Sequence, residues 1–251
     1  MNKLISIILP YYKKKKFIIK TLSSIYSQSY RNFELIIIYD DQNKDDFIFI
    51  NNYIKSKRLK NVRIINNKKN IGVGLSRNLG VNKSRGKFIA FIDADDYWLK
   101  NKLKYQINLM KKNNHDFTFT GYEIIDKKDK IIGKRNVPNK ISFNKLLVDN
   151  KIGLSTVVLK KKLIKGNYKF PNIKTKEDFV LWLKLSKKID LIGLNLHLTK
   201  WRKLDDSLSS NTLQKVVDGY KVYNKFLKLN KFSSFFYLFL LSMSYFKKNI
   251  N

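Results

Sequence analysis

The sequence predicts an α/β protein whose core is a mainly parallel, doubly wound sheet with helices on both faces. Short apolar segments of strand length alternate with helical patterns through the first hundred residues. Such alternation implies right-handed crossovers between parallel strands. Aspartates follow directly after two of the apolar segments, at 40–41 and within 93–96. Because open parallel sheets bind ligands beyond the carboxyl ends of their strands, these aspartates mark the expected site.

The strand segments of the first half are continuous apolar runs, which are typical of parallel strands covered on both faces. The clearest run is 34–39, which contains Leu-Ile-Ile-Ile. Ile18, Leu22 and Ile25 show the helical spacing expected between two such strands. In chain order we expect a strand at 5–9, a helix through Tyr26, a strand at 34–39, a polar helix, a strand at 62–65, a helix at 73–84 and a strand at 88–92.

The second half is less regular, and we expect a mixed arrangement that still belongs to one domain. No internal repeat and no linker rich in Pro, Gly or Ser separates it from the first half. The expected elements are an amphipathic helix through Leu99, Leu103, Ile107 and Met110, strands at 117–125 and 155–159 with a polar Lys-rich loop region between them, a helix at 179–185, a strand at 189–194 and helical structure from 212 onward.

Composition excludes several classes of protein. The 251 residues include no cysteine, which rules out disulfides, thiolate zinc sites and cysteine nucleophiles. The formal net charge is +33, but 45 of the 52 basic residues are lysine. Proteins that read nucleic acids depend on arginine for bidentate contacts, so we expect no nucleic-acid partner. The charge indicates general solvated basicity, with attraction to anionic membranes as the alternative.

No segment has the length of a membrane span or the form of a secretory signal. The most apolar stretch, 235–246, has twelve residues, whereas a span needs about 20. We therefore expect a cytoplasmic protein, either free or peripheral on the inner face of the cytoplasmic membrane. The tail from Lys231 to Lys248 has lysines at its ends, aromatic residues between them and no acid. It fits a helix packed on the core or one that docks on an anionic membrane, and both remain open.

The segment after the fourth expected strand carries the most informative motif, Asp93-Ala94-Asp95-Asp96. Carboxylates this close repel one another unless a cation or hydroxyl groups neutralise them. A divalent cation that holds a diphosphate supplies that neutralisation through one or two carboxylates. The alternative is an acidic turn that caps the following helix. Because the chain contains only 19 acidic residues, we favour the cation site.

Two further segments lie where strand ends should meet. Asp40-Asp41 can accept hydrogen bonds from a ribose or a base edge; taken alone the pair is more typical of a turn, but the neighbouring Asp93 cluster favours the binding role. Asn70 to Asn78 is a glycine-bearing loop that opens a helix, and a helix N-terminus favours an anion. It is close to a dinucleotide-binding fingerprint but departs from it, because Arg77 stands at the third glycine position and the loop follows the third strand.

Thr175 to Asp178 precedes an apolar helix and permits two interpretations. Thr-x-x-Asp is a capping-box pattern, in which Thr175 and Asp178 satisfy the first backbone N–H groups. Glu177 and Asp178 would also suit the positive end of the helix dipole. Their spacing alone favours this structural role over a catalytic one.

Together these segments resemble glycosyltransferase family 2, whose members have the GT-A fold. The resemblance spans about residues 4–210 and is most specific in the first hundred. It rests on Ile7 to Tyr12; on Ser24, Gln28, Tyr30 and 34–41; on Asn70 to Asn78; on Gly86 to Trp98; on Glu177-Asp178 with Trp182-Leu183; and on Trp201-Arg202 with Ser207-Leu208-Ser209.

The resemblance implies an inverting glycosyltransferase with a nucleotide-diphosphate sugar, a UDP-sugar first of all, as donor. Asp95 would hold Mn2+ or Mg2+ on the diphosphate, and Asp93 would contact the ribose or sugar or share the metal. Asp178, in one motif with Glu177, would take the proton from the acceptor hydroxyl as it attacks the anomeric carbon. The residues that the resemblance places at the donor are Pro10, Tyr11, Tyr12, Asp40, Asp41, Asn70, Gly72, Arg77, Asp93, Ala94, Asp95 and Arg202.

The implied domain is 1–210, with a nucleotide-sugar-binding half at 1–98, an acceptor-binding half at 99–210 and a C-terminal helical segment at 211–251. The implied acceptor is a glycan or lipid-linked hydroxyl in capsule, lipopolysaccharide or another bacterial surface polysaccharide. Lys13 replaces the family's usual Asn, and Gln42-Asn43 replaces Gly-Ser, which affects contacts with the donor base.

Three rival interpretations are weaker. A nucleotidyltransferase would have a glycine-rich loop after the first strand, where this chain has Pro10 to Lys13. A module that binds nucleic acid or membrane through charge alone leaves the Asp93 to Asp96 cluster without a purpose. An inactive relative is disfavoured because Asp95 and Asp178 are both present.

Overall fold

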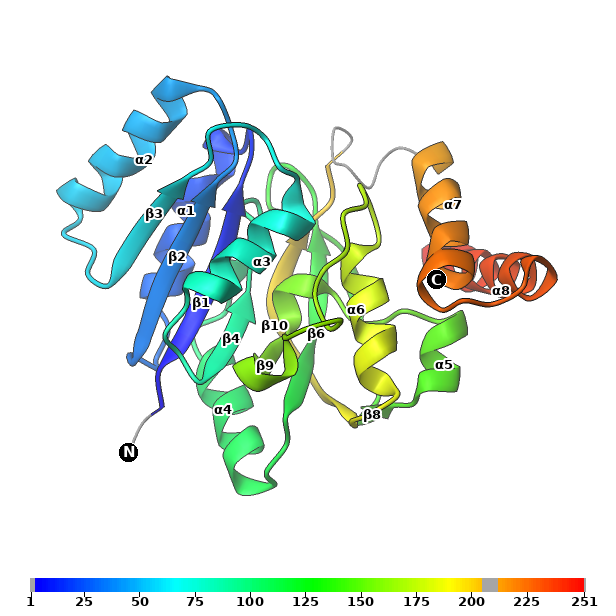
Figure 1. Ribbon diagram of the computed structural model, residues 1–251. Helices are drawn as coiled ribbons and strands as arrows, with labels where there is room; N and C mark the ends of the chain where they lie inside the picture. Colours follow the sequence, from blue (N-terminus) through cyan, green and yellow to red (C-terminus); the bar gives the residue numbers. More distant parts are fainter. Residues whose placement is uncertain (1–2, 205–211, 251) are drawn as a thin grey trace.

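One sheet forms the centre of the computed structural model, which describes residues 3–204 and 212–250. Its ten strands follow the order β3-β2-β1-β4-β9-β6-β10-β5, with β7 beside β6 and β8 beside β10 (Figure 1). The strands β1 to β4 are all parallel, which confirms the alternation predicted for the first half. The elements of this half are β1 (Ile5–Tyr11), α1 (Lys15–Tyr26), β2 (Phe33–Tyr39), α2 (Lys44–Ser56), β3 (Val62–Asn66), α3 (Val73–Lys83) and β4 (Phe88–Phe91).

The sheet is covered on both faces because its apolar residues alternate between two cores. Ile8 and Phe91 point into one core, which α3 and α6 share. Ile7 and Ile37 point into the other, which α1 and α4 share. Side chains along a strand alternate between faces, so fully apolar strands fill both cores at once. This arrangement confirms the predicted doubly wound sheet.

A close contact between α3 and β1 brings the start of α3 to the edge of the sheet. A Cβ at Gly80 would lie 2.5 Å from Cγ2 of Ile8, a distance that side chains do not tolerate. Glycine at this position therefore lets the helix backbone rest directly on the strand. The N-terminus of α3 then lies beside the carboxyl ends of the parallel strands, where the predicted site is.

The second half adds strands of both directions. β9 is antiparallel to β4 and β6, whereas β10 is parallel to β6. The elements are β5 (Tyr97–Trp98), α4 (Lys102–Lys112), β6 (Phe117–Ile125), β7 (Ile131–Arg135), β8 (Lys140–Ile141), α5 (Phe143–Val148), the 3-10 turn η1 (Leu154–Thr156), β9 (Val158–Lys160), the 3-10 turn η2 (Lys161–Leu163), α6 (Glu177–Ser186) and β10 (Leu191–Arg202).

Several boundaries predicted for this half were wrong. The expected loop region before residue 155 contains β7, β8 and α5. The strand expected at 155–159 starts only at Val158, because the residues before it form a 3-10 turn. The strand expected to end at 194 continues to Arg202, since its outer part pairs with β6 through two register shifts. The helix expected from Leu99 begins at Lys102.

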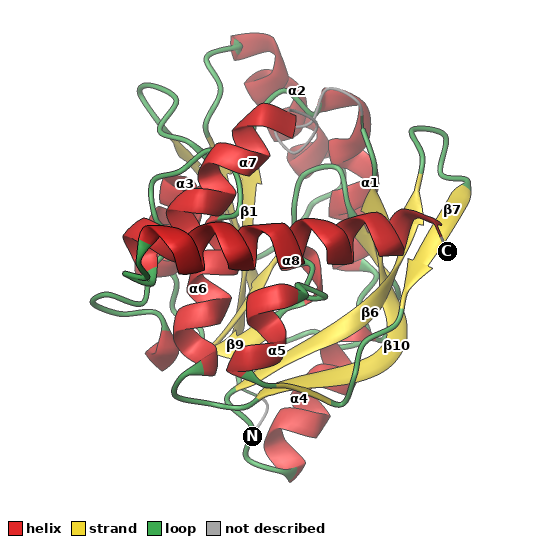
Figure 2. Ribbon diagram, turned by 90° about the vertical axis from the view of Figure 1, so that its right-hand side faces the viewer, coloured by secondary structure: helices red, strands yellow, loops and turns green. Residues whose placement is uncertain are grey.

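The C-terminal segment packs against the core with one of its faces. It consists of α7 (Thr212–Lys221), a π-helical turn η3 (Val222–Phe226) and α8 (Lys231–Ile250). Tyr223, Leu238 and Leu241 belong to the same apolar core as α6, and the hydroxyl of Tyr223 donates to the carbonyl of Leu147 at 2.6 Å. α8 lies outermost on this side of the molecule (Figure 2). The predicted domain boundary at 210 and Ser207 to Ser209 lie outside the described residues.

Within residues 3–204 and 212–250, every helix is too short or too polar to cross a bilayer.

Candidate active site

Asp40, at the end of β2, fixes the glycine-bearing loop in place. Its carboxylate is buried and accepts hydrogen bonds from the backbone N–H groups of Ile71 and Gly72, both at 2.9 Å. Asn67 donates to the same carboxylate at 2.8 Å, and the side chain of Asn70 donates to the backbone carbonyl of Asp40 at 2.8 Å. Gly72 has a φ of +87°, which glycine adopts without strain. The sequence-predicted Asp40, Asn70 and Gly72 therefore form one connected unit at the strand ends.

Asp41 organises the loops on either side of it. One carboxylate oxygen accepts from the backbone N–H groups of Gln42 and Asn43, at 2.7 and 3.2 Å. The other accepts from the N–H of Lys13 at 2.9 Å. Lys13 has a φ of +50°, so Asp41 stabilises a backbone conformation that is uncommon for lysine. Lys13, Gln42 and Asn43 depart from the pattern of the family that the sequence resembles. All three donate their backbone N–H groups to Asp41.

Pro10, Tyr11 and Tyr12 extend from the last residues of β1 into this region. Tyr11 is fully buried and stacks on Tyr39 with ring centroids 5.0 Å apart. Its hydroxyl donates to Asp46 at 2.6 Å, and burial together with that carboxylate raises the pKa of Tyr11. Tyr12 is exposed at the surface. Of the two tyrosines, Tyr12 is the one placed to stack on a ligand.

The turn from Asp93 to Asp96 directly follows β4, as the sequence predicted. Thr21 on α1 donates to the backbone carbonyls of both Ala94 and Asp96, at 2.9 and 2.7 Å. These bonds fix the turn to the helix below it. Asp93 and Asp95 remain partly exposed, whereas Ala94 and Asp96 are buried. The carboxylates of Asp93 and Asp95 are therefore accessible from solvent, whereas that of Asp96 is enclosed by the protein.

Asp96 has a structural role in the turn. It accepts hydrogen bonds from the hydroxyl of Ser155 at 2.6 Å and from the backbone N–H of Arg202 at 2.8 Å. Burial raises the pKa of Asp96 well above its usual value, and the nearby Asp95 and Asp93 raise it further. Asp96 thus joins the turn to η1 and to the end of β10, and leaves Asp93 and Asp95 as the candidate ligand pair.

Asp93 and Asp95 suit a hard divalent cation. Burial raises the pKa of Asp95, and repulsion from Asp93 raises it further, so a cation between them would relieve an unfavourable charge pair. Among the described residues, no group of three or more His, Cys, Asp or Glu side chains could hold a metal ion. Mg2+ and similar ions often use one or two carboxylates and take their other ligands from substrate phosphates and water. The carboxylates of Asp93 and Asp95 match this way of binding a divalent cation.

Lys14 forms an ion pair with Asp95, which the sequence analysis did not anticipate. Its ammonium nitrogen lies 3.2 Å from the carboxylate, and both side chains are mostly buried. Lys14 is one of four consecutive lysines, so nothing in the sequence singles it out. It places a positive charge directly on the expected metal ligand.

Arg77 connects the two sides of the site. Its guanidinium is buried and donates to Asp93 at 2.7 Å and to the carboxylate of Glu177. Burial alone would lower the pKa of Arg77, but Asp93 and Glu177 raise it, so the side chain stays charged. Its Nε atom is buried without a hydrogen-bond partner. Arg77 therefore couples the Asp93 turn to the start of α6, and its predicted contact with a phosphate remains a prediction.

Asp178, in the first turn of α6, has the properties of a general base. Burial raises its pKa to about 7, the adjacent Glu177 contributes to the rise, and Arg77 opposes it. One of its oxygens accepts from the backbone N–H of Phe179 at 2.7 Å. A general base is most effective when its pKa lies near the operating pH. Through Arg77, the sequence-predicted pair Glu177 and Asp178 is held close to Asp93.

The capping box predicted at Thr175 does not form. The residue that caps α6 is Lys176, whose φ of +62° and ψ of +17° are left-handed, and no side chain caps the helix. The hydroxyl and the backbone N–H of Thr175 donate instead to Asp218 on α7, at 3.1 and 3.0 Å. The loop before Asp178 is therefore anchored by the C-terminal segment.

Arg202, at the end of β10, is buried within the protein. Its guanidinium donates to the backbone carbonyls of Asp95 and Asp126, at 3.0 and 2.7 Å, and to the carboxylate of Asp129 at 2.5 Å. The group also lies over the ring of Phe17, 4.5 Å from its centroid. Arg202 therefore holds the Asp93 to Asp96 turn through the carbonyl of Asp95, and its contact with the donor stays a prediction.

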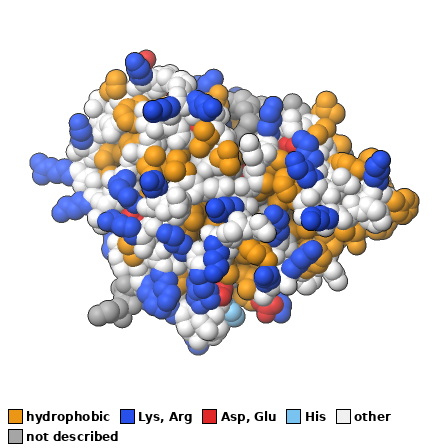
Figure 3. Space-filling model, in the orientation of Figure 1, with side chains coloured by type: hydrophobic (Ala, Val, Ile, Leu, Met, Phe, Trp, Pro, Cys, Tyr) orange, Lys and Arg blue, Asp and Glu red, His pale blue; other side chains and the backbone are white. Residues whose placement is uncertain are grey.

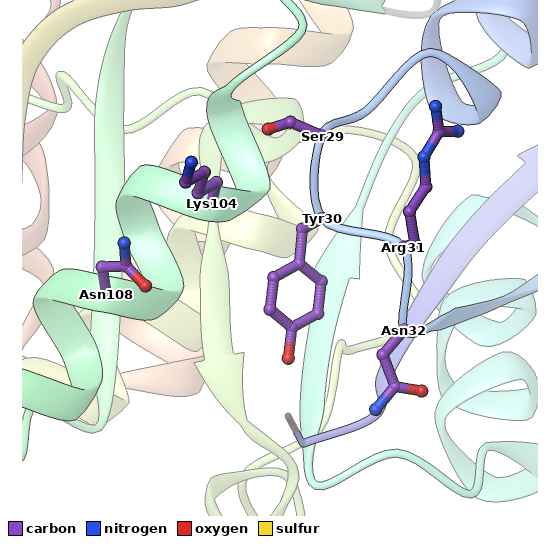
Figure 4. A pocket seen from close by; sticks show the side chains of 6 residues that line it. All are labelled: Ser29, Tyr30, Arg31, Asn32, Lys104 and Asn108. Carbon is purple, nitrogen blue, oxygen red and sulfur yellow. The ribbon is translucent and has the colours of Figure 1, made fainter. Parts of the chain in front are cut away.

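A hollow in the surface lies away from this site. It has a volume of about 510 Å3 and is bounded by the segment that leads into β2 and by Lys104 and Asn108 on α4 (Figure 4). It sits at the amino-terminal end of β2, whereas Asp40 lies at the carboxyl end of that strand. Acidic side chains do not contribute to its lining. We therefore do not assign it a role in the chemistry.

The sheet, with its parallel first half and its acidic turn after β4, has the architecture of the GT-A class of glycosyltransferases. The chain belongs to glycosyl transferase family 2, whose model matches residues 6–164.

Named relatives agree with this family. The chain is 35% identical over 237 residues to the UDP-Glc:alpha-D-GlcNAc-diphosphoundecaprenol beta-1,3-glucosyltransferase WfgD of Escherichia coli, which covers 94% of this chain and 90% of that protein. S. aureus TarS in complex with UDP-GlcNAc matches with a TM-score of 0.74 at 19% identity, over 98% of this chain and 73% of TarS. The mannosyltransferase PcManGT of Pyrobaculum calidifontis, in complex with GDP-Man and Mn2+, matches with a TM-score of 0.71 at 12% identity, over 97% and 73%. The two structures confirm the predicted fold.

Proposed function

We propose that this enzyme transfers a sugar from a UDP-sugar to a hydroxyl of a sugar carried on a lipid diphosphate, with inversion at the anomeric carbon. The reaction would contribute to a bacterial surface polysaccharide such as capsule or lipopolysaccharide. Similarity to the diphosphoundecaprenol-dependent glucosyltransferase WfgD supports the acceptor class, and UDP-Glc is the first donor to test. Residues 1–98 would bind the donor, and 99–210 the acceptor.

The observation that carries this proposal is the bridge formed by Arg77. One guanidinium contacts Asp93 on the expected metal-ligand turn and Glu177 beside the expected base. A glycosyl transfer needs a group that holds the leaving diphosphate and a base for the incoming hydroxyl within one sugar's reach of each other. Arg77 supports that proximity, because it ties together segments that are 100 residues apart in sequence.

Asp178 would accept the proton of the acceptor hydroxyl while the hydroxyl oxygen forms its bond to the anomeric carbon. The bond between that carbon and the diphosphate oxygen breaks in the same step, and the nucleotide diphosphate leaves. A pKa of about 7 makes Asp178 basic enough to take the proton and leaves about half of it deprotonated at pH 7. Glu177 stays paired with Arg77, so it tunes Asp178 and keeps the donor side in position.

Asp95 and Asp93 would hold Mn2+ or Mg2+. When bound, such an ion stabilises the negative charge that develops on the leaving diphosphate. Asp40 and Asp41 would shape the nucleotide pocket by fixing the loops around them, with Tyr12 available to contact the base. Asn70 and Gly72 would line the same pocket through the loop that Asp40 holds.

Transfer would be tested by measuring release of UDP from a panel of UDP-sugars, with an alkyl-diphosphate-linked sugar as acceptor and with or without Mn2+. We expect release with one donor only in the presence of metal and acceptor. Asp178→Asn should lower kcat by at least about a hundredfold, as general-base removal does, without weakening UDP binding. A variant at an exposed acid, Asp190→Asn, is the matched control. No transfer with any donor, or full activity in Asp178→Asn, would contradict the proposal.

A further inference from the structure

The last helix of the protein is apolar on two opposite faces, only one of which meets the protein. Leu238 and Leu241 on α8 are buried in the core. Phe232, Phe235 and Phe239 lie on the opposite side, with exposed fractions of 83, 61 and 61%. A helix with apolar residues on all sides is normally buried on all sides, and a contiguous exposed apolar surface marks an interaction site. The outer face of α8 is therefore a candidate interaction site.

The outer face of α8 continues onto α7. Leu213, Val216 and Val217 are all exposed on α7. The two helices cross closely where a Cβ at Gly219 would lie 2.7 Å from Leu238, and the rings of Tyr220 and Phe235 are 4.8 Å apart. Hydrophobic side chains gather over this end of the molecule (Figure 3). We call this surface the C-terminal apolar face; it consists of Leu213, Val216, Val217, Phe232, Phe235, Phe236, Phe239 and Met243.

The charged residues of the C-terminal segment itself are nearly all basic. Residues 212–250 contain seven lysines and one acid, Asp218. Asp218 is buried and is already bonded to Thr175, Gln214 and Lys221. Lys225 and Lys228, just before α8, and Lys231, its first residue, are exposed. Exposed phenylalanines combined with lysines, in the absence of exposed acids, are the chemistry that binds an anionic lipid surface.

A second copy of the chain would fit this face less well. Each copy carries a formal net charge of +33, so two such faces would bring lysines against lysines. An anionic bilayer offers the opposite charge and an apolar interior for the phenylalanine rings. The charge pattern therefore favours lipid over self-association.

The same segment contacts the loop that precedes the base. Asp218 on α7 holds the backbone and the hydroxyl of Thr175, three residues before Asp178. A protein that lies on a bilayer through α7 and α8 would thus keep the start of α6 near the membrane surface. A sugar attached to a lipid diphosphate would be presented at that surface.

We propose that the C-terminal apolar face docks the enzyme onto an anionic lipid bilayer and so brings the base side of the site to a lipid-linked acceptor. The choice of acceptor rests on the proposed function, whereas the docking itself rests on the exposure and charge of this face.

Docking is tested with the full chain and vesicles of phosphatidylcholine, with or without phosphatidylglycerol, by co-sedimentation. Wild type should bind the mixed vesicles and bind far less to phosphatidylcholine alone. A variant with Phe232→Ser, Phe235→Ser and Phe239→Ser should lose about tenfold or more in binding, since three rings no longer insert. The matched apolar control is Ile48→Ser with Phe49→Ser on α2, which is exposed at the opposite end of the molecule (Figure 1).

A charge variant, Lys225→Glu with Lys231→Glu, should also weaken binding to mixed vesicles, whereas Lys57→Glu with Lys60→Glu should not. Circular dichroism and UDP binding would show that each variant is folded. Equal vesicle binding by wild type and the triple variant, or no binding by wild type, would overturn docking. So would light scattering that shows a dimer in wild type and a monomer in the triple variant, without vesicle binding.

Transfer to a water-soluble acceptor separates this inference from the proposed function. The triple variant should keep that activity and lose activity on acceptor embedded in mixed vesicles. Absence of transfer to the soluble acceptor in wild type would contradict the proposed function, whereas vesicle binding would still test docking.

Discussion

Glu177→Gln should shift the pH dependence of transfer, because Glu177 helps to set the pKa of Asp178. Asp178 acts as a base only when it is deprotonated, so kcat/KM should rise with pH through its pKa of about 7. Burial is the main reason for that high pKa, and the negative charge of Glu177 adds to it. Removing the charge should lower the pKa of Asp178 and move the acidic limb of the profile to lower pH.

The size of the shift follows from the contacts of Glu177. Two unit charges about 4 Å apart interact by about 4 kcal/mol at an effective dielectric of 20. Arg77 already neutralises much of Glu177, so only a fraction of that energy acts on Asp178. Arg77 would in turn become less compensated in the variant, which also favours the ionised form of Asp178. We expect a decrease of about one pKa unit, equivalent to about 1.4 kcal/mol.

The assay is the pH profile of kcat/KM from pH 5 to 8.5, with Asp190→Asn as the control for loss of a surface carboxylate. For a one-unit decrease, activity at pH 6 should rise from about 9% to about 50% of each enzyme's own plateau. An acidic limb that stays at the wild-type position in Glu177→Gln would refute the reasoning. A limb that moves to higher pH would refute it as well, because the loss of the charge of Glu177 and the freed charge of Arg77 both favour ionised Asp178.

Three further predictions concern the turn and its supports. Asp95→Asn should abolish the Mn2+-dependent rise in melting temperature that UDP produces. The control Asp45→Asn, which changes an exposed residue on α2, should keep that rise. A rise retained in Asp95→Asn would contradict the assignment of Asp95 as a metal ligand. Lys14→Met should lower the Mn2+ concentration needed for half-maximal activity, because an ammonium group no longer competes for Asp95. An unchanged Mn2+ concentration would contradict this competition. Asp218→Ala should reduce the free energy of unfolding by about 1–3 kcal/mol, since the buried N–H and hydroxyl of Thr175 lose their acceptor, and urea denaturation would measure the loss.

The parallel half of the sheet could be predicted because its strands carry their signal locally. Segments such as β2 are apolar throughout, which is the pattern of a strand covered on both faces. β7 carries no such signal, because it lies at the side of the sheet with most of its residues exposed. β10 was predicted too short, since its outer part includes polar and exposed positions such as Asn195.

The site was predictable where residues act at strand ends, and unpredictable where distant segments meet. Asp93 and Asp95 follow β4 directly, so the topology alone placed them. The ion pair of Lys14 with Asp95 and the bond of Ser155 to Asp96 depend on how loops fold over the strand ends. The capping box failed for the same reason, because Asp218 comes from 43 residues away and takes the hydroxyl of Thr175. The sequence around Thr175 contains no information about an acceptor as distant as Asp218.

The bridge formed by Arg77 has a consequence for the order in which substrates bind. If Asp93 holds a cation that arrives with the donor, as proposed, it is shared between that cation and Arg77, and donor binding would redistribute the charge that Arg77 offers to Glu177. The proposed base beside Glu177 would then respond to whether the donor is present, and by reciprocity the donor would respond to the state of the base. Such coupling would favour a sequence in which the nucleotide sugar binds first and the acceptor second.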